Sequence, residues 1–149
     1  MSAALPTPYA GDLTPREAWD LLATDPRALL VDVRTDGEWR TIGVPDTADL
    51  VGDDADERTA FVQWTDAFGR PNPAFLNDLA AVGLTADEPR PVVFLCRSGV
   101  RSVAAATTAT AAGLGPAYNV ISGFEGDVGP DGQRGHWGWR AEGLPWREA

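Results

Sequence analysis

Strand patterns and helix patterns alternate along this chain, and this alternation is the feature that most restricts its possible folds. Short apolar runs rich in β-branched residues occur at 28–33, 91–95 and 118–121. Helical patterns lie before or between them, at 14–24, 72–82 and 100–112. Such alternation is typical of an α/β fold with a mostly parallel central sheet and helices on both faces. The 149 residues fit a single domain, and we expect 1–149 to form one, with its core at about 12–146.

Local signals mark several of these elements. Thr14 and Glu17 can form a capping box around Pro15, which suits the first turn of a helix. The polar run at 34–40 is predicted to hold one helical turn, and 61–64 is either a short strand or an aromatic-rich loop. The acidic patch at 53–57 is expected to be a solvated loop. The segment from residue 123 onward is expected to be ordered but irregular.

Charge restricts the partners. The chain has 22 acidic and 12 basic residues and a net charge of -10, so its long-range field repels nucleic acid and anionic membranes. No apolar stretch is long enough for a membrane helix, and residues 1–10 lack the features of a signal peptide, so we expect a cytoplasmic protein. Every basic residue is Arg, which excludes mechanisms that need a Schiff-base or P-loop lysine.

Cys96 is the single cysteine, so the chain can form neither an internal disulfide nor a cysteine-rich metal site. It follows the run at 91–95 and precedes the helix expected at 100–112. Backbone N–H groups at a helix start favour negative charge, and Arg97 and Arg101 add two positive charges, so the position favours a reactive thiolate. The alternative is a buried cysteine with a packing role.

The residues around Cys96 resemble a known family. The run Cys-Arg-Ser-Gly-Val-Arg-Ser at 96–102 is similar to the active-site loop of the rhodanese (sulfurtransferase) family, C-R-x-G-x-R-S. Three further segments match family motifs in the same order: the L-x-D-V-R…E-[YFW] signature at 30–39, the V-x-x-L-x-G-G segment at 119–124 and the G-L-P ending at 143–146. Together they cover about 28–146, and the resemblance is to single-domain bacterial rhodaneses.

This resemblance implies a three-layer rhodanese-like fold and a sulfurtransferase that works through a Cys96 persulfide. It implies a substrate-binding loop made of Arg97, Ser98, Gly99, Val100, Arg101 and Ser102. Arg97 is expected to face the entrance and Arg101 to brace the loop, while Ser102 either caps the following helix or hydrogen-bonds the sulfur. Asp32 and Arg34 are expected to support the site as a buried pair.

The expected partners are a small anionic, thiosulfate-like donor and a thiol or cyanide acceptor, without metal or cofactor. Phosphatases and arsenate reductases of this fold use a loop of seven residues. The six residues from Cys96 to Arg101 form a narrower ring, which favours sulfur over a phosphate-sized anion. A carrier or redox-regulatory module without turnover is the alternative function. The physiological donor and acceptor and the oligomeric state stay open.

Some features depart from the family or stand outside its motifs. The family usually continues E-[YF]-x-x-G-H-I-P-G, but here the His is missing, Gly43 is displaced by one residue and Asp46 replaces a Gly. His136, the single histidine, is expected to be a surface or packing residue. The tryptophans near the end, at 137, 139 and 146, either line an entrance above Cys96 or pack the tail onto the sheet.

Overall fold

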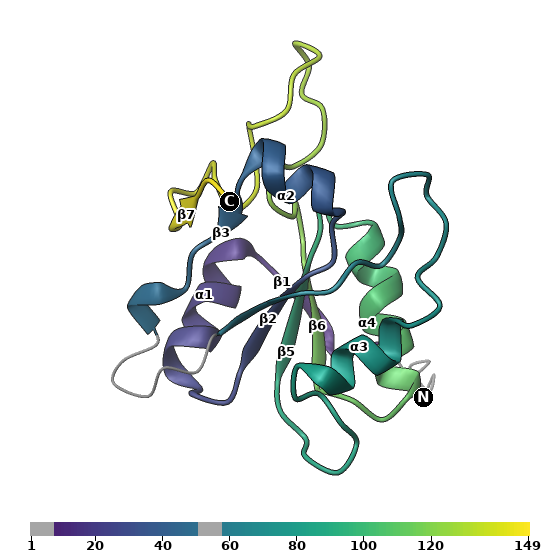
Figure 1. Cartoon of the computed structure of the whole chain (residues 1–149). Helices are drawn as coiled ribbons and strands as arrows, with labels where there is room; N and C mark the ends of the chain where they lie inside the picture. The colour runs from purple at the N-terminus through teal and green to yellow at the C-terminus, as the bar shows by residue number, and fades with distance from the viewer. Residues whose placement is uncertain (1–7, 51–57) are drawn as a thin grey trace, which may run out of the picture.

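The computed structural model describes residues 8–50 and 58–149 (Figure 1). The acidic patch expected at 53–57 therefore lies outside the described residues. Within the described ranges, five parallel strands form the central sheet in the order β1-β6-β5-β2-β4. Their bounds are Gly11–Leu13 (β1), Ala117–Val120 (β6), Val92–Leu95 (β5), Leu29–Asp32 (β2) and Thr59–Phe61 (β4). The predicted α/β class and parallel sheet are confirmed.

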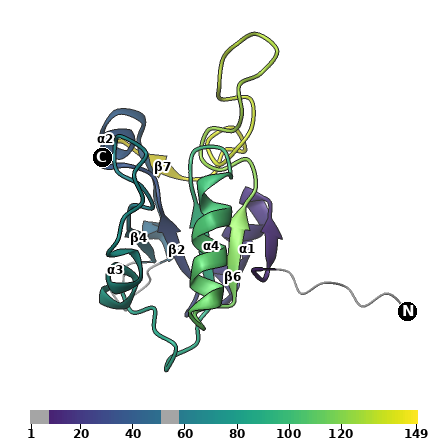
Figure 2. The same ribbon diagram turned by 90° about the vertical axis from the view of Figure 1, so that its right-hand side faces the viewer.

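Helices cover both faces of this sheet (Figures 1 and 2). One face packs against α1 (Pro15–Thr24), and the other packs against α3 (Phe75–Ala81) and α4 (Arg101–Ala111). A further helix, α2 (Asp36–Ile42), follows β2 at the carboxyl end of the sheet, and the short helix η1 (Ala48–Leu50) comes after it in the chain. The resulting three layers leave the carboxyl ends of the strands as the place where a site can form.

Local capping explains where the first two helices begin. Thr14 and Glu17 form the capping box predicted for α1, with the Thr14 hydroxyl accepting from the Glu17 N–H at 3.1 Å. Thr35 and Glu38 form a second box at the start of α2. The helix predicted at 34–40 as a single turn is therefore longer, because this box satisfies free N–H groups of its first turn.

Alternating side chains of β5 fill two separate cores. Val92 and Phe94 point to the face covered by α3 and α4, and Cys96 belongs to the same cluster. Val93 and Leu95 point to the face covered by α1. All of these side chains are nearly inaccessible to solvent. A strand buried on both faces reads as a continuous apolar run, which is why β5 is the clearest strand in the sequence.

The sequence patterns missed or misplaced several elements, including β3 and η1 at 44–50. Strand β1 was not predicted, the strand near 61–64 is β4 and begins two residues earlier, and the tail ends in β7 (Trp146–Arg147). Strand β7 pairs in antiparallel fashion with β3 (Val44–Pro45). In the described part of the chain, no helix has the length and apolar character needed to cross a membrane.

Candidate active site

Cys96 lies at the carboxyl end of β5, between the strand and the first turn of α4. Its side chain is only 1% exposed. The Gly99 N–H donates to Sγ at 3.1 Å, and the Ser102 hydroxyl lies 3.2 Å from Sγ. The sulfur atom therefore sits where polar groups of the loop and of α4 converge.

Gly99 is required by the shape of this loop. Its φ is +97°, and a Cβ there would lie 3.2 Å from the Ser122 nitrogen and 3.3 Å from the Val120 oxygen. A side chain would therefore be strained and crowded against the segment that follows β6. The absence of a side chain lets the Gly99 N–H turn inward to Cys96.

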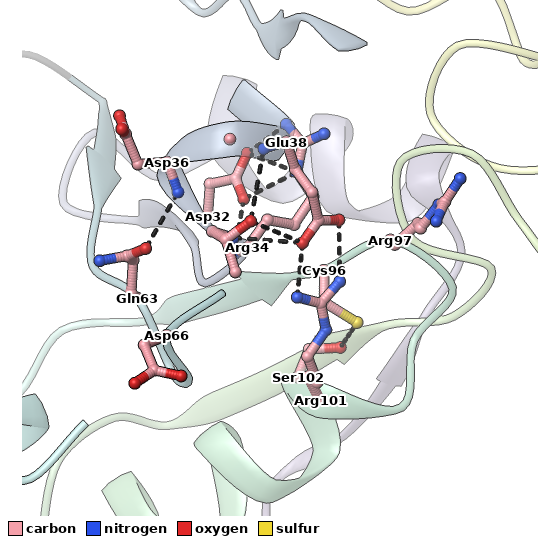
Figure 3. A network of polar contacts seen from close by, with 12 residues as sticks. Asp32, Arg34, Asp36, Glu38, Gln63, Asp66, Cys96, Arg97, Arg101 and Ser102 are labelled. Carbon is pink, nitrogen blue, oxygen red and sulfur yellow. Dashed lines mark hydrogen bonds and ion pairs between the residues drawn. The ribbon is translucent and has the colours of Figure 1, made fainter. Parts of the chain in front are cut away.

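Arg101 is bound to Glu38 of α2 by two hydrogen bonds, from Nη1 to Oε1 at 2.7 Å and from Nη2 to Oε2 at 2.9 Å (Figure 3). Burial alone raises the pKa of Glu38, but the hydrogen bonds and charge of Arg101, together with hydrogen bonds from Thr35, outweigh it, so the pKa of Glu38 is lowered. The pKa of Arg101 is raised, mainly by its hydrogen bonds to Glu38 and also by the negative charges of Glu38 and Asp32, which outweigh the effect of burial. This pair ties the first turn of α4 to α2.

Arg97 occupies the outer side of the loop. Figure 3 shows its guanidinium directed away from the Arg101–Glu38 pair. Its Nε donates to Glu125 at 2.8 Å, and the two side chains are 39% and 13% exposed. Arg97 thus keeps contact with solvent while Glu125 neutralises part of its charge.

Asp32 and Arg34 form a fully buried ion pair, with Arg34 Nη2 at 2.7 Å from the Asp32 carboxylate. Arg34 also donates to the Gly43 carbonyl at 2.8 Å, and its guanidinium lies 4.2 Å from the centre of the Phe124 ring. The pair therefore joins β2, the end of α2 and the segment after β6. It reaches the loop through Phe124, whose N–H donates to the Cys96 carbonyl at 2.8 Å.

The segment after β6 holds the loop from its backbone side. Besides Phe124, the N–H groups of Glu125 and Gly126 donate to the Arg97 carbonyl at 3.0 and 3.1 Å. Gly123 allows this approach, because a Cβ there would lie 2.4 Å from the Cys96 carbonyl oxygen. In the sequence these residues stand out only as part of a family motif, and the available signal for their contact with the loop is a glycine next to an apolar residue.

The remaining loop residues divide between surface and interior. Ser98 is half-buried, and Val100 is 72% exposed. Val100 is also the N-cap of α4. The expectation that Ser102 caps this helix is therefore wrong. Ser102 instead donates to the Asn119 side chain at 2.5 Å.

Asn119 was missed as a site residue, and so was its partner Asp12. The Asn119 amide donates to the Asp12 carboxylate at 3.0 Å. Asn119 lies on β6 and is 2% exposed. A polar side chain in the middle of a buried strand was the signal, because such a group needs a hydrogen-bond partner inside the protein.

The candidates in the tail differ in their surroundings. His136 is exposed and pairs with Asp131 at 2.9 Å. Trp139 is fully buried, with its ring 5.8 Å from that of Trp19, and packs the tail onto the α1 face of the sheet. Trp137 and Trp146 are partly exposed. Packing is thus the role of Trp139.

Comparisons with known proteins agree with this architecture. Residues 14–128 match the family model described as a rhodanese-like domain. An uncharacterized protein of Rickettsia conorii, RC0915, is 33% identical over 132 residues, which cover 88% of this chain and 92% of the relative. An uncharacterized protein in the dnaA 5' region of Rickettsia montanensis matches to the same extent.

Two solved structures are also similar. The crystal structure of Rv0390 from M. tuberculosis has a TM-score of 0.83 and 49% identity, and the match covers 95% of this chain and 99% of that one. The solution structure of the 30 kDa polysulfide-sulfur transferase homodimer from Wolinella succinogenes has a TM-score of 0.63 and 25% identity, with coverage of 93% and 78%. The family model, the sheet order and the loop at the end of β5 agree, and the chain therefore belongs to the rhodanese-like domain family.

Proposed function

We propose that this protein is a sulfurtransferase that moves a sulfane sulfur from thiosulfate or a similar donor to a thiophilic acceptor through a Cys96 persulfide. The observation that carries the proposal is the position of Cys96 Sγ, which lies at the start of α4 and accepts the Gly99 N–H at 3.1 Å. A helix start and an inward N–H stabilise negative charge on the sulfur. The family assignment supports sulfur transfer, and the Wolinella neighbour is named for it.

The reaction has two steps. The Cys96 thiolate attacks the outer sulfur of thiosulfate, a new S–S bond forms, and the S–S bond of thiosulfate breaks as sulfite leaves with the electron pair. The acceptor then attacks the terminal sulfur of the persulfide. Cyanide leaves as thiocyanate, a thiolate leaves as a new persulfide, and the Cys96 thiolate is restored.

The loop residues have distinct roles in this scheme. Arg97 lies on the outer side, partly open to solvent, and attracts the anionic donor. Arg101 braces the loop through Glu38. The amides that follow Cys96, with Gly99 the one already directed at Sγ, stabilise the charge of the persulfide. Asp32 and Arg34 support the loop from behind through Phe124.

The size of the loop supports sulfur as the group carried. Cys96 to Arg101 spans six residues. A ring of amides shortened by one residue has room for one sulfur atom beside the thiolate and is too narrow for a phosphorus with its oxygens. Phosphate and arsenate chemistry is disfavoured for this reason.

The test is thiosulfate:cyanide sulfur transfer in wild type and Cys96→Ser. We expect thiocyanate formation in the wild type and none above background in the variant, because Cys96 is the single cysteine. The variant serves as a matched control if its urea unfolding midpoint equals that of the wild type. Equal activity in the two proteins would refute the assignment of Cys96.

A sulfur carrier without turnover is the second candidate, favoured by the 1% exposure of Cys96. A persulfide at such a buried position is shielded from acceptors that cannot enter the loop. Mass spectrometry after thiosulfate treatment separates the two functions. A stable gain of one sulfur atom that survives added cyanide supports the carrier, and loss of that sulfur as thiocyanate supports the enzyme.

A further inference from the structure

A line of polar side chains runs from Cys96 across the sheet to its edge. Ser102 Oγ on α4 lies 3.2 Å from Cys96 Sγ and donates to Asn119 Oδ1 on β6 at 2.5 Å. Asn119 Nδ2 donates to Asp12 Oδ1 on β1 at 3.0 Å. The Tyr9 hydroxyl donates to the same Asp12 oxygen at 2.9 Å. Ser102 and Asn119 are 0% and 2% exposed, so water has little access to the inner part of this line.

The chemistry of Asp12 fixes the direction of these hydrogen bonds. A carboxylate only accepts, so the Asn119 NH2 group faces Asp12 and the Asn119 carbonyl oxygen faces Ser102. That oxygen also only accepts, so the single Ser102 proton is donated to Asn119. Ser102 then presents lone pairs to Cys96, which suits a neutral thiol that donates its own proton.

A negatively charged sulfur needs the opposite arrangement. Lone pairs of Ser102 beside a thiolate or persulfide are unfavourable, whereas an O–H donated to the sulfur stabilises its charge. Ser102 has one proton, so it serves either Asn119 or the sulfur. Asn119 therefore competes with Cys96 for that proton, although the two side chains have no direct contact in this line.

We propose that Asn119 is a positioning residue that holds the Ser102 proton away from Cys96 and so determines the pH range over which the thiol becomes reactive. Asp12 orients the Asn119 amide for this purpose. The inference rests on the proposed role of Cys96 as a nucleophile but not on sulfur transfer itself. In this proposal the Ser102 hydroxyl donates to Asn119 while Cys96 is a neutral thiol, and it donates to the sulfur once the sulfur is charged.

Other charges around Cys96 stay in place when this line is altered. Arg101 is paired with Glu38 of α2, and Arg97 is paired with Glu125 of the segment after β6. The buried Asp32–Arg34 pair lies at the end of β2. Asp12 lies on β1, and Tyr9 lies just before that strand. A change confined to Asn119 leaves all of these charged groups present, so its effect on Cys96 passes through Ser102.

The test is the pH dependence of Cys96 alkylation by iodoacetamide, which needs no sulfur donor. We expect Asn119→Leu, which has the same branching at Cγ and cannot accept a hydrogen bond, to lower the midpoint of the pH–rate profile by about one unit, the value of one hydrogen bond to a charged group. In a Ser102→Ala background the same substitution should cause no shift. Failure of thiosulfate:cyanide transfer would leave this readout intact.

A second variant guards against misfolding of Asn119→Leu. Asp12 is exposed, and Asp12→Ala frees the Asn119 amide to turn, so Ser102 can donate to the sulfur. We expect a downward shift that is larger with Ser102 in place than in the Ser102→Ala background, since only the charge effect of Asp12 remains in that background. Equal shifts in the two backgrounds, for either variant, would overturn the proposal.

Discussion

Removing the negative charge of Asp32 should destabilise the protein strongly. Arg34 is fully buried and donates to Asp32 from Nε at 3.0 Å and from Nη2 at 2.7 Å. Asp32→Asn keeps the shape of the side chain but leaves a buried guanidinium without its counter-charge. Breaking a buried pair in this way costs about 3–5 kcal/mol. That is a large part of the roughly 5–15 kcal/mol that stabilises a typical domain.

Urea unfolding followed by tryptophan fluorescence measures this loss. With an m-value of about 2 kcal/mol/M, the midpoint should fall by roughly 1.5–2.5 M. Asp36→Asn is the matched control, because Asp36 pairs with Arg40 four residues along α2 with both side chains exposed. That exposed pair should contribute less than about 0.5 kcal/mol.

A double variant tests the physical reason. If the cost comes from an uncompensated charge, Asp32→Asn combined with Arg34→Met should be at least as stable as Asp32→Asn alone, because the charge is gone. Two results would refute the reasoning. One is a urea midpoint for Asp32→Asn as high as that of Asp36→Asn. The other is a double variant whose loss of unfolding free energy equals the sum of the losses measured for Asp32→Asn and for Arg34→Met.

Two further predictions concern the ion pairs of the loop. Because the Glu38 pKa is lowered from its ordinary value of 4.5, the contribution of the Glu38–Arg101 pair to stability is complete above pH 4.5 and is lost as the pH falls through the native pKa. The free energy of unfolding lost in Glu38→Gln should therefore shrink in acid, and a loss independent of pH would contradict the pairing. Glu125→Gln removes the negative charge beside Arg97 and should lower the KM for thiosulfate by about fivefold or less with kcat unchanged, whereas a raised KM would show that Glu125 orients Arg97 for binding.

Sequence patterns predicted the elements whose formation depends on residues close together in the chain. The α1 start follows from a capping box within four residues, and β5 follows from an apolar run, so both were found. Strand β1 has three residues and exists because it pairs with β6, which comes late in the chain. Glu38 and Arg101 are 63 positions apart, and Ser102 and Asn119 are 17 apart. Their contacts depend on how the strands are ordered in the sheet, which periodicity does not encode.

The hydrogen bonds from 124–126 to the loop carbonyls also bear on local unfolding. The Cys96 and Arg97 carbonyls accept from this segment, while the Gly99 N–H donates to Sγ. Further along, the Gly135 N–H donates to the Glu125 carbonyl, so the long excursion beyond β6 closes onto the same point (Figure 1). Opening the loop would break bonds in both segments at once. Amide hydrogens of the two segments should therefore exchange with solvent as one cooperative unit. Exposure of the Cys96 sulfur by local unfolding should then require the same opening free energy as that of the tail.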